Sequence, residues 1–193
     1  MAITESYIFA VISDGAGCSK CAKDAAWCTV NAVIEFCRKK GSEFFNQKAK
    51  LNAKKMIFEI QQALFEKASC VDAEFSQMKS TLILLCLNRE TKQYTAVHIG
   101  DGLIAKCSKQ NSEIISYPEN GPTKQFTYMV NSPNVFRHLR VGTGLFCEGD
   151  CFLLGSDGVF EECYSTNEYI FRIKELDTYD DFDDDTTYCK ITI

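Results

Sequence analysis

Several features are scarce or missing in this chain of 193 residues, and each shortage excludes a class of protein. Only two histidines are present, which leaves little material for an imidazole-rich zinc site. No apolar run approaches the roughly 20 residues of a membrane-spanning helix, and the N-terminus has no basic, apolar secretory signal. A glycine-rich phosphate loop of the P-loop type is also missing. We therefore expect a cytoplasmic protein with no membrane partner that is not a P-loop kinase or ATPase.

Positive charge is scarce as well. The chain has 21 Lys and Arg against 26 Asp and Glu, a net charge of −5 and a pI of about 5.1. Nucleic-acid-binding domains usually carry a basic stripe, so we expect no nucleic-acid partner. Hydrophobic residues make up 46 % of the sequence, enough to build a sizeable core. The length and the lack of linker-like segments predict one domain over residues 1–193.

Cysteine, in contrast, is abundant, with eleven residues scattered along the chain. The odd number and the aliphatic composition favour reduced, buried thiols over a disulfide scaffold. Cys18 and Cys21 form a CxxC pair, but no second pair follows at the spacing of a zinc site. A zinc or redox role for this pair is the less favoured interpretation.

Periodicity predicts strands and helices in separate runs. Apolar residues at helical spacing predict helices over 22–39 and 44–68, and shorter ones over 159–163 and 166–175. Short apolar or alternating runs predict strands over 6–13, 80–87, 94–99, 103–107, 113–117, 151–155 and 188–193, with weaker candidates at 124–130 and 135–141. The segregation indicates an α+β fold with mainly antiparallel sheets.

Four acidic turns lie next to predicted strands. Asp14, Asp101 and Asp157 each follow an apolar run, and the run 183–185 precedes the last strand. Carboxylate oxygens are the ligands that Mg²⁺ and Mn²⁺ prefer, and Asp-Gly turns also offer backbone carbonyls. A single Asp-Gly turn is usually only structural. Because four acids occupy equivalent places, we expect them to meet and bind metal; an acidic domain whose loops are merely turns is the alternative.

Four segments in order resemble the type 2C family of metal-dependent serine/threonine protein phosphatases, in its compact form. Residues 9–17 are similar to the first Asp-Gly motif of that family. Residues 80–85 are similar to its Ser-Thr strand, and 97–102 to its Gly-Asp turn. Residues 152–160 match the Ser-Asp-Gly motif, and 184–187 the terminal Asp-x-x-Thr motif. Any one segment is weak, but four in the right order are specific.

This resemblance implies two stacked antiparallel sheets flanked by helices, a four-layer αββα sandwich. It also implies hydrolysis of phosphoserine and phosphothreonine in a phosphorylated protein by a metal-bridged water, without a covalent enzyme intermediate. Two Mg²⁺ or Mn²⁺ ions would take part, with a weaker third. The oligomeric state is left open.

The resemblance also assigns ligands. Asp14 would bridge the two ions, and the Gly15 carbonyl would complete one of them. Asp157 and Asp184 would bind the other, with Asp185 as the alternative to Asp184. Asp14, Asp157 and Asp184 would therefore form the catalytic set. Asp101 would lie near the third ion, and Glu161 stands where the family often has an Asp.

One part of the family pattern is missing. The family has an N-terminal strand with a phosphate-binding Arg and a further acidic ligand, whereas the first 13 residues here offer only Glu5. This departure motivates a second hypothesis, a pseudophosphatase or phosphoprotein-binding module of the same fold. For His98 we expect a place facing solvent or a neighbouring sheet, and for His138 a basic surface turn, although a phosphopeptide contact is the alternative.

Overall fold

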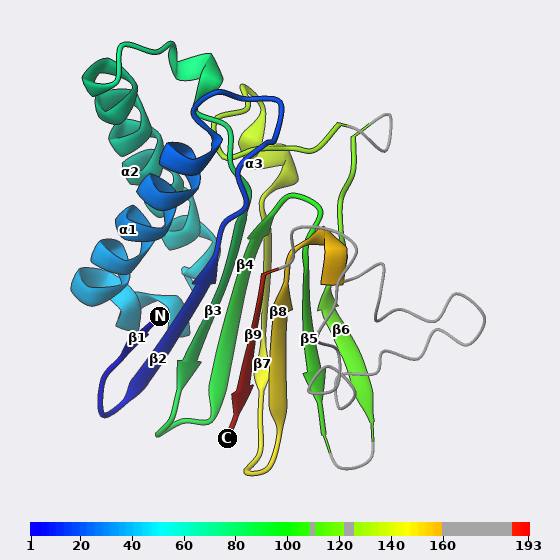
Figure 1. The fold of residues 1–193 in the computed structure, drawn as a ribbon. Coiled ribbons are helices and arrows are strands. Elements are labelled where there is room, and N and C mark those ends of the chain that lie inside the picture. Colours follow the sequence, from blue (N-terminus) through cyan, green and yellow to red (C-terminus); the bar gives the residue numbers. More distant parts are fainter. Residues whose placement is uncertain (109–110, 122–125, 160–186) are drawn as a thin grey trace.

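Two antiparallel sheets form the centre of the molecule, and two long helices cover one of them (Figure 1). The computed structural model describes residues 1–108, 111–121, 126–159 and 187–193. The first sheet has the order β1-β2-β3-β4-β7 and the second β6-β5-β8-β9. The α+β sandwich of stacked antiparallel sheets is therefore confirmed.

The five-stranded sheet consists of β1 (Ala2–Ile3), β2 (Tyr7–Ile12), β3 (Leu82–Asn88), β4 (Gln93–Ile99) and β7 (Arg140–Leu145). The four-stranded sheet consists of β5 (Leu103–Cys107), β6 (Ser112–Ser116), β8 (Cys151–Gly155) and β9 (Tyr188–Thr192). The helices are α1 (Ala22–Lys40), α2 (Ala49–Cys70) and α3 (Val135–His138), with 3₁₀ turns η1 (Gly41–Phe45) and η2 (Phe75–Gln77).

Strand β3 shows why the hydrophobic pattern fits this arrangement. Successive side chains of a strand point to opposite faces. Leu82 and Leu84 belong to the core beneath the helices, whereas Ile83 and Leu85 belong to the core between the sheets. Because both faces are covered, the strand is an unbroken apolar run in the sequence, and all seven residues are buried.

The helices present one apolar face each to this sheet. In α2 the buried residues recur at helical spacing, and they include Met56, Ile57, Ile60 and Leu64. An ion pair of 2.9 Å between Lys67 Nζ and Asp24 Oδ1 joins α2 to α1. The last turn of α1 carries three basic residues, which suits the negative end of the helix dipole.

Most of the predicted elements are confirmed, and two predictions are wrong. The predicted strand at 135–141 begins instead as the short helix α3, and β7 starts only at Arg140. Residues 126–130 contain an isolated bridge between Thr127 and Asn120 rather than a strand. The predicted helices at 159–163 and 166–175 lie, except for Val159, outside the described residues, as does the acidic run 177–185.

A short strand, β1, precedes β2, so the prediction that the N-terminal strand is missing is wrong. Strand β1 pairs antiparallel with β2, Ala2 opposite Phe9 and Ile3 opposite Ile8. It has only two residues and no charged side chain. Glu5 lies in the turn between these strands, at the end of β2 remote from Asp14. Six strand residues, about 20 Å, lie between them, so Glu5 is no replacement ligand for the site of Asp14.

Two further observations concern membranes and thiols. No helix in the described part of the chain is long and apolar enough to cross a bilayer. The ten cysteines in that part form no disulfide with one another. Burial raises the pKa of the Cys86 thiol well above its ordinary value, which keeps this thiol protonated and unreactive.

Candidate active site

The strand register brings distant segments to one edge of the five-stranded sheet. Ile12 at the end of β2 pairs with Ile83, and Leu82 at the start of β3 pairs with Ile99. The turns that continue beyond these pairs contain Asp14 and Asp101. Antiparallel pairing therefore places both acids at the same end of the sheet, beside the residues that lead into β3.

The second sheet contributes its own acid to this edge. Leu103 at the start of β5 pairs with Gly155 at the end of β8. Asp101 lies two residues before the first of these and Asp157 two residues after the second. Strand β9 joins the same edge, because the Ser156 amide donates to the Thr187 carbonyl over 2.9 Å. The predicted ligands Glu161 and Asp184, and the alternative Asp185, lie outside the described residues.

Thr81 fixes the turn that carries Asp14. The Thr81 amide donates to the Asp14 carbonyl over 2.8 Å, and the Asp14 amide donates to Thr81 Oγ1 over 3.0 Å. Ser13 Oγ donates to the Thr81 carbonyl over 2.7 Å. Behind this turn, Ser80 Oγ lies 2.8 Å from Thr29 Oγ1 of α1. The Ser-Thr pair at the start of β3 thus acts as a backbone anchor for the first acidic turn.

Glycines permit the close approach of these segments. A Cβ atom at Gly15 would overlap the backbone of Ala22, where α1 begins. A Cβ atom at Gly102 would overlap the Gly155 carbonyl and the Ile83 side chain. Gly100 has a φ of 116°, a conformation that side-chain-bearing residues rarely adopt. The Asp-Gly and Gly-Asp-Gly patterns therefore reflect steric requirements of the site.

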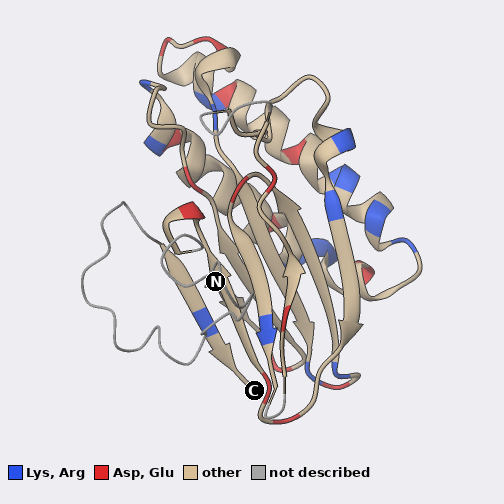
Figure 2. Cartoon of the chain, turned by 90° about the vertical axis from the view of Figure 1, so that its right-hand side faces the viewer, with Lys and Arg blue, Asp and Glu red and all other residues tan. Residues whose placement is uncertain are grey.

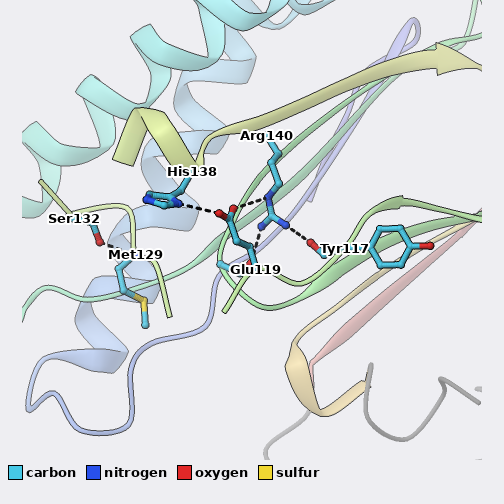
Figure 3. A network of polar contacts seen from close by, with 7 residues as sticks. Tyr117, Glu119, Met129, Ser132, His138 and Arg140 are labelled. Carbon is cyan, nitrogen blue, oxygen red and sulfur yellow. Dashed lines mark hydrogen bonds and ion pairs between the residues drawn. The ribbon is translucent and has the colours of Figure 1, made fainter. Parts of the chain in front are cut away.

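A polar network supports the turn that carries Asp101 (Figure 3). Arg140 donates through Nη2 to the Gly100 carbonyl over 2.6 Å and through Nη1 to the Tyr117 carbonyl. Its Nε lies 3.4 Å from Glu119 Oε2, and His138 Nδ1 lies 2.9 Å from Glu119 Oε1. Burial lowers the pKa of Arg140, although Glu119 and Asp101 oppose the shift. The guanidinium remains charged, since an arginine side chain is not deprotonated in proteins.

The prediction that His138 belongs to a basic surface turn is therefore wrong. It ends the short helix α3, pairs with Glu119 and stacks on Tyr128 with 3.3 Å between ring centroids. It does not line the cavity that contains the acids. Its contacts make it a support for the segment between β6 and β7.

His98 faces the neighbouring sheet, one of the two orientations expected from the sequence. The side chain is fully buried in β4, and Nδ1 lies 2.8 Å from Ser116 Oγ of β6. Burial, aided by the nearby Arg140 charge, lowers its pKa well below the ordinary value. The imidazole is neutral and does not line the cavity, which favours a packing role.

The acidic turns line one cavity of about 970 Å³. Asp14, Gly15, Asp101 and Asp157 all belong to its wall. The sequence did not single out Lys79, the only basic residue in the described part of this wall, although it directly precedes the Ser-Thr pair. It also missed Thr127, whose hydroxyl donates to Asp101 Oδ2. Further wall residues come from η2 and from the loop before α3, and they include Phe75, Phe126, Met129, Asn131 and Ser132.

The donor set fits a hard divalent cation. The described wall offers three carboxylates and the neighbouring Gly15 carbonyl as oxygen donors; it contains no histidine, and its thiol, that of Cys18, is exposed. Within the described residues, no three His, Cys, Asp or Glu side chains already stand close enough to hold an ion. The carboxylates therefore share a cavity that is larger than a closed coordination shell.

Comparison with known proteins gives a family and a fold. The family model Protein phosphatase 2C matches residues 2–188. A search of curated proteins finds no match. Among solved structures, RsbX in complex with magnesium is 17 % identical, with a TM-score of 0.58; the alignment covers 82 % of this chain but only 64 % of RsbX.

Two other structures extend the comparison. The catalytic domain of the serine/threonine protein phosphatase PstP, in complex with 2 manganese ions, is 12 % identical with a TM-score of 0.56. That alignment covers 86 % of this chain and 73 % of PstP. A Stage II Sporulation E family protein from Thermanaerovibrio acidaminovorans is 13 % identical with a TM-score of 0.63, covering 100 % and 98 %. At such identities these structures establish a shared fold.

Proposed function

The chain belongs to the Protein phosphatase 2C family, and on that premise we propose that it hydrolyses phosphoserine and phosphothreonine in proteins with the help of Mg²⁺ or Mn²⁺. The observation that carries this proposal is the cavity wall. Asp14, Asp101 and Asp157 follow three different strands, yet they line one cavity. If these acids served only to form turns, nothing would require them to line the same cavity.

The ligands follow from the positions of the donors. Asp14 and the Gly15 carbonyl would hold the ions from the β2 side, and Asp157 from the β8 side. Asp184 would join them from the segment before β9, since Thr187 is hydrogen-bonded to Ser156. Asp101 and Glu161 would serve a weaker third ion. When bound, the two ions supply an activated water and neutralise charge on the phosphoryl group.

The remaining groups of the cavity position the reactants. Thr81 holds Asp14 in one geometry, so that little reorganisation is needed during the reaction. Lys79 supplies positive charge at a wall that is otherwise acidic, and a phosphate dianion needs such a partner. The positive charge of Lys79 matters because β1 offers no arginine or lysine.

The proposal is tested by hydrolysis of p-nitrophenyl phosphate. We expect activity that requires added Mn²⁺ and is lost in Asp157→Asn, whose amide cannot replace the carboxylate charge. Asp72→Asn is the matched control, because Asp72 is exposed, lies outside the cavity wall and has a φ of 53° that asparagine tolerates.

Calorimetric titration with Mn²⁺ completes the test. Two binding sites together with turnover support the phosphatase. Weak or single-site binding without turnover supports a binding module of the same fold and contradicts the enzyme. Metal-independent activity retained by Asp157→Asn would overturn the assignment of Asp157.

A further inference from the structure

Helix α2 carries an apolar stripe on the face that it turns away from the core. Leu51, Phe58 and Phe65 are 49 %, 60 % and 62 % exposed. They are spaced by seven residues, about two helical turns, so they lie in one line along the helix. Figure 1 shows α2 on the helical side of the molecule, away from the four-stranded sheet. Three large, exposed apolar side chains in one line along a helix indicate an interaction surface.

Neighbouring elements widen this stripe. The Phe58 ring lies 5.0 Å from that of Phe136 in α3, and the Phe65 ring lies 6.3 Å from that of Phe75 in η2. Lys54 Nζ lies 5.8 Å from the Phe136 ring centroid. The apolar surface thus reaches from the middle of α2 to two adjoining segments.

Charges beside the stripe follow a definite order. Lys48 and Lys55 are seven residues apart, as are Glu59 and Glu66, and all four are exposed. Helical spacing places them on the same flank of the stripe, with the lysines before Phe58 and the glutamates after it. Glu59 forms a surface ion pair of 2.9 Å with Lys40, and Glu66 accepts a hydrogen bond from Gln62. Such exposed contacts exchange at little cost.

We propose that this stripe is the interface of a homodimer in which the α2 helices of two copies pack antiparallel, with Phe58 near the two-fold axis. An antiparallel two-fold arrangement brings the same flank of both helices together. With a rise of 1.5 Å per residue, Lys48 lies about 15 Å before Phe58 and Glu66 about 12 Å after it. Lys55 and Glu59 lie about 4.5 Å before and 1.5 Å after it.

In this antiparallel arrangement the charges of one copy are therefore complementary to those of the other. Each Lys48 faces the Glu66 of the second copy, and each Lys55 faces its Glu59, within the reach of long side chains. Leu51 of one copy faces Phe65 of the other. A parallel two-fold arrangement would instead place this flank of the two copies on opposite sides of the interface, where these charges could not pair.

The same order argues against an anionic lipid surface as the occupant. Lys and Arg residues lie mostly on the helical side of the molecule, as Figure 2 shows. A membrane-binding helix carries lysine along its whole polar face. Here Glu59 and Glu66 occupy the second half of the flank, where anionic lipids would repel them. The proposal of this interface does not rest on the proposed enzymatic function.

The oligomeric state of the full chain tests the proposal. We expect light scattering and sedimentation to report a dimer that dissociates on dilution. Phe58→Ser should weaken the dimer by about tenfold or more, because both copies lose the central ring. Leu145→Ser is the matched control, since Leu145 is 65 % exposed on β7, outside the stripe, and its replacement should leave dissociation unchanged.

A charge exchange tests the antiparallel register without removing any apolar group. Lys55→Glu and Glu59→Lys should each weaken the dimer, because each brings like charges together. The double variant should restore it. Circular dichroism of each variant checks that the monomer remains folded.

Three results would overturn the proposal. These are a wild-type chain that stays monomeric throughout the micromolar range, a double variant that fails to recover, and cosedimentation of the monomer with phosphatidylserine vesicles. Each can be obtained without any measurement of phosphatase activity.

Discussion

Gly15 shows how a single missing side chain controls the first acidic turn. The turn is pressed against the start of α1, and a Cβ atom at Gly15 would meet the backbone of Ala22, which cannot move without displacing the helix. Gly17, two residues later, has nothing within 4 Å of its corresponding position. The two glycines of one motif thus have different physical roles.

We therefore expect opposite outcomes for two alanine substitutions. Gly15→Ala should lower the free energy of unfolding by about 2 kcal/mol or more, because backbone atoms would overlap. It should also weaken Mn²⁺ binding, because the turn that carries Asp14 must shift. Gly17→Ala should leave both unchanged. Chemical denaturation and calorimetry measure the two effects, and equal behaviour of the variants would contradict the steric argument.

Lys79 is the second residue whose role depends on its place in the wall of the cavity. Lys79→Ala should raise the KM for p-nitrophenyl phosphate by about ten- to a hundredfold, since a charge-assisted contact to phosphate is worth about 1.5–3 kcal/mol. The inhibition constant of inorganic phosphate should rise in parallel. Lys79→Arg should retain most of the affinity.

Lys39→Ala is the control for Lys79. Lys39 is 69 % exposed on α1 and does not line the cavity, so its loss should leave KM unchanged. If Lys79→Ala also leaves KM and phosphate inhibition unchanged, Lys79 does not contact the substrate.

At the level of elements, Arg140 connects three segments. From β7 it reaches the turn after β4 and the loop after β6, and it does so through the forked geometry of one guanidinium. Lysine has the same charge but cannot bind three acceptors in this arrangement. The bridge consequently holds the Asp101 turn and the loop against each other.

Arg140→Lys should therefore destabilise the fold by about 1–2 kcal/mol, because it removes guanidinium hydrogen bonds to the Gly100 and Tyr117 carbonyls. It should also weaken the proposed third ion site through the Asp101 turn, with little effect on the other two. Arg38→Lys offers a control, since Arg38 is 62 % exposed and its pair with Glu35 contributes about 0.5 kcal/mol or less. Chemical unfolding and Mn²⁺ titration compare the two variants. If Arg140→Lys is as stable as Arg38→Lys, Arg140 does not hold the Asp101 turn against the loop after β6.

At the level of the whole molecule, His98 couples stability to pH because it lies between the two sheets. Its pKa is depressed in the folded protein, whereas the unfolded chain titrates near 6.5. Below that pH the unfolded state binds a proton that the folded state does not. His98 therefore lowers stability as the pH falls through about 6.5, and has no such effect above it.

The unfolding free energy should consequently fall more steeply between pH 6.5 and 5 in the wild type than in His98→Gln. The difference in slope should approach about 1.4 kcal/mol per pH unit. Denaturant titrations at several pH values measure it. Parallel curves for the two proteins would show that the imidazole gains its proton within the fold.

The sequence by itself determined the class of fold, most strands and both long helices. It could do so because the unbroken apolar run of β3 fits a strand covered on both faces. The apolar residues of α2 recur at helical spacing, which fits a helix with one buried face. It also identified Asp14, Asp101 and Asp157 as a set, since each stands directly after an apolar run. Glu161, Asp184 and Asp185 stay predictions from the family pattern.

Only the tertiary structure decided what surrounds these acids. The register of antiparallel strands places Lys79 and Thr127 in the wall of the cavity, although neither has a sequence signal of its own. It also makes His138 a support rather than part of a basic surface turn, because Glu119 approaches from another segment. Local sequence encodes which faces are buried, whereas contacts between residues 19 to 68 positions apart set which polar groups meet.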